Sequence, residues 1–389
     1  MLWTDRPDEF RSVSALAAEY FEKDETNCAE WLYHKVVLES EAIGDDGDFD
    51  RVMESLDYGY QRSEAEVVLR NIQEQIVSHR VSQSILAQTT YWKGRVSGRS
   101  YEKDEALAHY EEAIVLYRAV GARLGEANTL QAIGDVLKFK DRNDEALAHY
   151  EEAIGLYRAV GDRIGEANTL KEIGDVLQFK DRNDKALAHY EEAIGLFRAV
   201  GERLGEANTL KAIGDVLQFK KRTDEALAHY EEAIVLYRAV GERLGEANTL
   251  KAIGDLQSDF NLAIQDFFQP ALKIYEQVGS QYSQGRILAN SIAPTYLKLG
   301  NSYQAKTCYE EALKFWTDVD YTPGINQCKN ALANINQSSD NRRGPIAPTI
   351  DEPLSSRARP KRPMTSQQKV FIGFCIGMTI ALLVWKLKN

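Results

Sequence analysis

The strongest constraint on this chain is an internal repeat with a fixed period. Residues 145–184 and 185–224 are identical at 33 of 40 positions. The letters GEANTL begin at positions 125, 165, 205 and 245, so they recur with the same period. Self-similarity at a fixed period of this length is typical of chains that stack one small structural unit many times. The sequence therefore predicts a repeat array.

Each unit has the pattern of two amphipathic helices. Apolar or small residues recur at steps of three and four in each half of the unit, and the stretch KDRND between the halves is short and polar. Gly121, after LYRAV, is placed as a helix-ending residue with positive φ. Such a helix hairpin cannot bury its apolar face alone, so it must stack on its neighbours. The apolar positions of one unit are Ala127, Leu130, Ile133, Gly134 and Leu137, then Ala146, Tyr150, Ala153, Ile154 and Tyr157.

The small residues at the expected helix crossings carry a family resemblance. Gly134, Ala146 and Ala153, with Tyr150 between them, resemble the tetratricopeptide repeat pattern. The period exceeds the usual tetratricopeptide repeat length of about 34 residues. The sequence motif GDRxGEA is similar to that of the Leu-Gly-Asn repeat variant. The resemblance implies an all-α fold, a right-handed superhelical α-solenoid in which the first helix of each hairpin lines a concave groove.

The array is expected to extend beyond its closely matching units, 105–255, to about residues 84–337, with six hairpins and a capping helix. Gly94 precedes Ala106 by the same interval that separates Gly134 from Ala146, which indicates a degenerate first repeat. Pro270 predicts a kink or a break in a later second helix.

The N-terminal segment, residues 1–80, does not repeat. Stretches near 7–23, 26–42, 48–58 and 62–79 have helical periodicity, so the segment is predicted to form an N-terminal helical region whose role the sequence leaves open.

The C-terminal tail predicts a membrane anchor. Residues 370–385 carry no charge, and nine of them are Val, Ile, Leu or Phe. A helix of this length spans ~24 Å, so flanking lysines must complete a predicted transmembrane helix at 369–387. Residues 338–368 read as a disordered, basic, Pro/Ser/Arg-rich linker. By the positive-inside tendency, the array lies on the cytoplasmic side, as in tail-anchored proteins.

Small residues spaced by four in this tail also suggest a packing face. Two membrane helices can approach closely along such a face, so a homo-oligomer is one possible state of the chain. The positions are Gly373, Gly377 and Ala381.

The charge distribution and the cysteines limit the classes of function that are expected. The formal net charge is −12, yet residues 335–389 hold nine Lys or Arg against three Asp or Glu, so the remainder is strongly acidic. An acidic body argues against a nucleic-acid partner. Four scattered cysteines form no disulfide framework, and the N-terminus has no secretory signal.

No catalytic, cofactor or metal site is predicted. Phosphate-loop, HExxH and nucleophile-elbow motifs do not occur, and four of the six histidines are copies of one repeat position. The stretch DDGDFD has a faint likeness to a calcium loop through Asp46, Asp48, Asp50 and Asp57, but Arg51 stands where that loop requires Gly. A solvated turn that caps a helix is the favoured interpretation, and an enzyme is not expected.

The resemblance places a polar set on the concave side of each first helix, and steps of three and four keep each set on one helix face. In tetratricopeptide relatives, Asn at such positions holds peptide backbones, and an Asn amide offers both donor and acceptor. The residues are Asn128, Gln131 and Asp135, then Asn168, Lys171 and Asp175, then Asn208, Lys211 and Asp215, and finally Asn248 and Lys251.

Polar residues of these types are also expected on any helix face that is simply solvated. Because the repeats are near-identical copies, the recurrence of Asn is not independent evidence for a binding site. In the first repeat, Gln88, Tyr91 and Arg95 take the equivalent positions and are expected to contact a partner. The favoured function is a membrane-tethered adaptor that binds a protein or an extended peptide in the groove. The alternatives are a self-assembling membrane platform and a regulatory effector that signals through residues 1–80.

Overall fold

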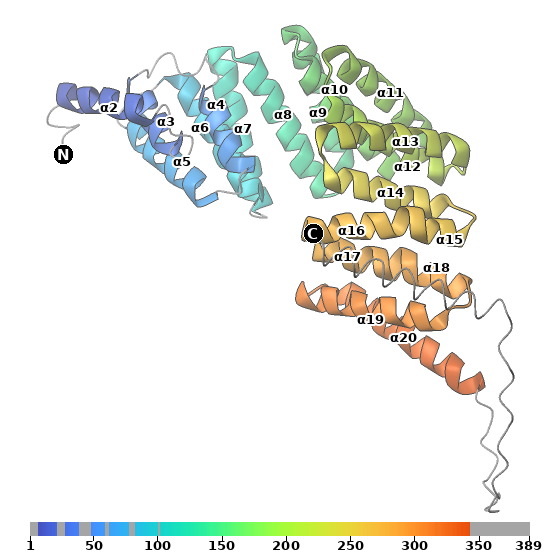
Figure 1. Ribbon diagram of the computed structural model, residues 1–389. Helices are drawn as coiled ribbons and strands as arrows, with labels where there is room; N and C mark the ends of the chain where they lie inside the picture. The colour runs from blue at the N-terminus through green and yellow to red at the C-terminus, as the bar shows by residue number, and fades with distance from the viewer. Residues whose placement is uncertain are drawn as a thin grey trace, which may run out of the picture. The chain divides into compact units, whose positions relative to one another are not determined.

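The computed structural model describes residues 7–21, 28–38, 48–58, 62–77, 82–99 and 102–342. Every regular element in these stretches is a helix (Figure 1), which confirms the all-α prediction. The predicted transmembrane segment, with Gly373, Gly377 and Ala381, lies outside the described residues, as does the linker beyond Arg342. Within the described part, no helix combines the length and the apolar character that crossing a bilayer requires.

Among the described residues, four helices precede the repeats, close to the expected segments. They are α2 (Pro7–Phe21), α3 (Cys28–Leu38), α4 (Asp48–Tyr58) and α5 (Arg62–Val77). Leu32, Phe49 and Ile72 are fully buried and join the same core as the repeats. Helices α4 and α5 both contact the first helix of the repeat array.

The repeats form consecutive helix hairpins (Figure 1). Successive first helices contact one another more closely than successive second helices do, as expected when the first helices line the inner side. The pairs are α6 (Gln83–Arg99) with α7 (Lys103–Val120), α8 (Arg123–Phe139) with α9 (Asn143–Val160), α10 (Arg163–Phe179) with α11 (Asn183–Val200), and α12 (Arg203–Phe219) with α13 (Thr223–Val240).

The later hairpins contain π-helical turns. Pro270 and Pro294 each stand two residues after the end of such a turn, in a helix that continues without a break, so a broken helix at Pro270 is the wrong expectation. A π turn lets the helix accommodate a residue that has no N–H to donate. The elements are α14 (Arg243–Leu256), α15 (Phe260–Leu262), η2 (Ala263–Phe268), α16 (Gln269–Gln277), α17 (Gln281–Ile287), η3 (Leu288–Ile292), α18 (Ala293–Lys298), α19 (Ser302–Asp318) and α20 (Thr322–Arg342).

A glycine–tyrosine contact closes the four hairpins from α6–α7 to α12–α13. Gly174 on α10 lies against the ring of Tyr190 on α11, and a Cβ at this glycine would stand 2.4 Å from Tyr190 Cε1. Gly134 with Tyr150 and Gly214 with Tyr230 repeat this contact. All three tyrosines are fully buried. The glycine therefore sets how closely the two helices approach.

Ion pairs tie each repeat to the next. Arg158 at the end of α9 donates to Glu166 on α10 at 2.5 Å and to Glu192 on α11 at 2.7 Å. Lys180 reaches back to Asp144 in the same way. These groups are partly exposed, so they contribute little stability. Their regularity holds the register between units. Gly121 ends α7 with φ of 74°, as expected from the sequence.

Replacing Gly174 with Ala should destabilise the protein by about 1–3 kcal/mol, because the added methyl group collides with the Tyr190 ring. Urea unfolding followed by circular dichroism measures the change.

Gly195→Ala is the matched control. Gly195 lies in the middle of α11 with no atom within 4 Å of the added Cβ, so its replacement should stabilise the helix by up to about 1 kcal/mol. Equal losses in the two variants would contradict a packing role for Gly174.

Candidate functional site

The predicted polar set lies on the solvent-accessible side of the first helices, and we call it the first-helix face. On α8, α10, α12 and α14 its positions are partly or largely reachable by solvent, with Asn168 and Asn208 exposed. The face consists of Asn128, Gln131 and Asp135; Asn168, Lys171 and Asp175; Asn208, Lys211 and Asp215; and Asn248, Lys251 and Asp255.

Buried tyrosines hold three of its four asparagines. The Tyr157 hydroxyl donates to Asn128 Oδ1 at 2.7 Å, and Tyr237 donates to Asn208 Oδ1 at 2.7 Å. Each tyrosine comes from the second helix of the same hairpin. Asn248 Oδ1 accepts from Tyr275 at 2.8 Å and from an arginine of α17. These tyrosine–asparagine hydrogen bonds were not predicted from the sequence, although a tyrosine follows Asn128 and Asn208 at the same interval.

The acidic positions of the face are fixed in a similar way. Tyr190 donates to Asp175 Oδ1 at 2.7 Å, and Lys171 Nζ lies 2.7 Å from Asp175 Oδ2. The next repeat has the same arrangement around Asp215. The pairing of Lys with Asp at four-residue spacing leaves the face with nearly balanced charge. It therefore favours a partner without strong net charge at this surface.

One pocket of ≈ 460 Å³ opens on this side, between α6 and α8. Arg95, Lys138 and Asp135 are among its lining residues. Solvent reaches the Asp135 carboxylate, yet partial desolvation in the pocket, with Glu172 nearby, raises its pKa to about 6. Tyr150 donates a hydrogen bond to this carboxylate at 2.7 Å, which favours its charged form.

A row of exposed phenylalanines flanks the polar positions. Phe139, Phe179 and Phe219 end α8, α10 and α12, and their exposed fractions are 61%, 71% and 66%. Each follows the Asp of its own repeat at a step of four, so it lies on the same side of the helix. Lys103 Nζ covers the ring of Phe139 at 4.6 Å. This row was not predicted from the sequence, although a phenylalanine recurs just before the polar turn of each of these repeats.

In the first repeat, the equivalent positions face the N-terminal helices. Gln88 and Tyr91 are buried, so the expectation that they contact a partner is wrong. On α4, Asp50 accepts from Trp92 Nε1 at 2.6 Å, and Asp57 pairs with Arg95 at 2.7 Å. Helix α4 therefore contacts the side of α6 that carries these positions.

The contacts of Asp50 and Asp57 also concern the alternative that the DDGDFD stretch binds calcium. Asp50 and Asp57 are engaged by Trp92 and by arginines, and Asp46 lies outside the described residues. Across the residues that the structure describes, no cluster of His, Cys, Asp or Glu is arranged to hold a metal ion.

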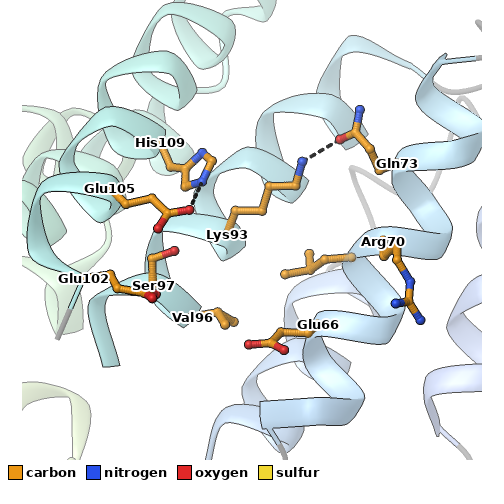
Figure 2. Close-up of a pocket in the computed structure, with 10 residues that line it drawn as sticks. Glu66, Arg70, Gln73, Lys93, Val96, Ser97, Glu102, Glu105 and His109 are labelled. Carbon is orange, nitrogen blue, oxygen red and sulfur yellow. Dashed lines mark hydrogen bonds and ion pairs between the residues drawn. The ribbon is translucent and has the colours of Figure 1, made fainter. Parts of the chain in front are cut away.

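A second pocket, of ≈ 500 Å³, lies between α5, α6 and α7. Figure 2 shows Lys93 reaching Gln73, at 2.6 Å, and His109 turned toward Glu105 of its own helix. Burial lowers the pKa of Lys93. The lining mixes acidic and basic side chains, among them Glu66, Arg70, Lys93 and Glu105.

Comparisons with known proteins agree with this architecture. The sequence profile of the tetratricopeptide repeat matches residues 102–159, 165–239 and 205–277, and a second profile of the same repeat matches residues 289–315. No curated protein matches the sequence.

Several solved structures share the fold at low identity. A signal transduction ATPase with a tetratricopeptide repeat sensor from Pyrococcus horikoshii is 14% identical, with a TM-score of 0.66 over 87% of this chain and 50% of that chain. Aspartyl phosphate phosphatase F from Bacillus subtilis is 14% identical, with a TM-score of 0.54 over 79% and 90%. The Rap conjugation gene regulator of plasmid pLS20, in complex with the Phr* peptide, is 15% identical, with a TM-score of 0.51 over 80% and 90%.

Together the two repeat profiles cover about half of the chain, and the hairpins are stacked as those repeats require. The chain belongs to the tetratricopeptide repeat family.

Proposed function

We propose that this protein is an adaptor that binds an extended peptide segment of another protein across the first-helix face. The observation that carries the proposal is the row of exposed phenylalanines beside polar side chains that buried tyrosines hold in place. Rigid polar groups next to exposed aromatic rings suit peptide binding, because little side-chain entropy is lost on association.

An extended segment suits this surface for a chemical reason. The Asn128 and Asn208 carbonyls already accept from tyrosines, so their amide N–H groups remain for a partner. The carbonyls of an extended backbone are free to accept, whereas those of a helix are used within the helix. The pLS20 regulator, which shares the fold, was solved in complex with a peptide, and this supports a peptide as the ligand.

We also propose that the C-terminal tail tethers the adaptor to a membrane. The support is the uncharged run 370–385, preceded by a basic stretch that contains Arg357, Arg359 and Lys361. A tether would keep a bound client near the membrane surface.

Phe179→Ala combined with Phe219→Ala should weaken peptide binding by about tenfold or more, because two rings lose contact area in the complex. A random dodecapeptide library panned on the full chain supplies the ligand. Fluorescence anisotropy then measures its Kd for each variant.

Val115→Ala combined with Val235→Ala is the matched control. These valines are 66% and 64% exposed but belong to second helices, so the Kd should not change. Failure of panning to yield a saturable ligand, or an equal loss of affinity in both pairs, would refute binding at the first-helix face.

Removing residues 368–389 should release the protein from membranes. Fractionation and fluorescence imaging of the full and the shortened chain, each fused to a fluorescent protein, measure the difference. If the full chain is found in the soluble fraction, the tether proposal is wrong.

A further inference from the structure

The four asparagines of the first-helix face are not equivalent, because one of them lacks its tyrosine. Tyr157 and Tyr237 follow Asn128 and Asn208 at one fixed interval, but the residue at that interval after Asn168 is Phe197. The exchange removes a hydroxyl from an otherwise repeated arrangement.

The Phe197 ring occupies the same place as the tyrosine rings. It is fully buried and lies against Gly205, as Tyr157 lies against Gly165 and Tyr237 against Gly245. The helices around it are also unchanged, since α10 and α11 pair as α8 and α9 do. A second local difference is Glu172, one turn after Asn168, where the other repeats have Ala132, Ala212 and Ala252. Glu172 is paired with Lys138 and Lys171, so the missing hydroxyl is the difference that reaches the Asn168 amide.

Asn168 is left with its whole amide available. Asn168 is exposed, and its side-chain amide makes no hydrogen bond to any described residue. Lys171 in the same repeat is, by contrast, paired with Asp175 and Glu172. An amide side chain carries one acceptor oxygen and two donor hydrogens. A tyrosine that donates to the oxygen turns the NH₂ group outward and reduces the capacity of the oxygen to accept.

We propose that Asn168 pairs with both the N–H and the C=O of one partner residue, while the other asparagines of the face serve mainly as donors. Phe197 is then the residue that determines this specificity by leaving Asn168 free. The inference rests on the proposed function, and it selects a partner that presents an unpaired backbone N–H at this repeat. Such a group is found in an extended segment and is absent where proline occupies that position.

Phe197→Tyr tests the inference in two ways. The added hydroxyl should bond to Asn168 as Tyr237 bonds to Asn208, so the melting temperature of the full chain should rise. The Kd of the panned dodecapeptide should increase by about fivefold, because one backbone hydrogen bond is lost. A lower melting temperature, or an unchanged Kd, would overturn the proposal.

A backbone ester scan of the same dodecapeptide supplies a readout that altered stability does not mimic. Replacing each amide N–H in turn with an ester oxygen should reveal one position whose loss weakens binding to the natural chain. That position should become insensitive in Phe197→Tyr and in Asn168→Ala. If the position remains equally sensitive in both variants, Asn168 does not accept from the backbone.

Tyr237→Phe is the reciprocal variant. It frees Asn208, so a second ester-sensitive position should appear in the peptide. No new position would contradict the role of the tyrosines. If these tests fail while the Phe179 and Phe219 double variant still weakens binding, the peptide-binding function stands and only the special role of Asn168 is wrong.

Discussion

The contact between a glycine and a tyrosine ring inside the hairpins from α6–α7 to α12–α13 is the constraint on which the rest of this array depends. A ring of Tyr190 fits between α10 and α11 because Gly174 has no side chain there. The close approach brings the end of the ring to the far side of the first helix. The hydroxyl of Tyr190 thus reaches Asp175 on the surface of the first helix and holds its carboxylate in place. Packing inside the hairpin and order on its surface therefore have one cause.

The repeated architecture was readable from the sequence because it rests on strict periodicity. The hairpins, the helix-ending Gly121 and the degenerate first repeat around Gly94 all follow from spacing and residue size. The family resemblance placed the polar set on the concave side of the first helices, and steps of three and four kept each set on one helix face. The residues of each set could be placed on one side of a helix without knowledge of any contact.

What the sequence could not supply was the set of contacts made across helices. Tyr157 reads as a core residue, and nothing local indicates that its hydroxyl emerges beside Asn128. Gln88 and Tyr91 share the periodicity of groove positions, yet α4 buries them, because a non-repeating segment carries no spacing from which its partner can be inferred. The π-helical turns before Pro270 and Pro294 also depend on how each helix packs against its neighbours.

The ion pairs between units have a consequence for how such a gene can change. Arg158 meets Glu192 one unit further along the chain, and Arg118 and Arg198 meet their own glutamates at the same separation. Removing or adding one whole repeat therefore rejoins each of these arginines with an identical partner, whereas the pair of Lys138 with Glu172 has no copy in the other repeats. A chain with one repeat more or fewer would keep the same Arg–Glu pairs between its units. The length of the binding surface is thereby open to selection in whole units.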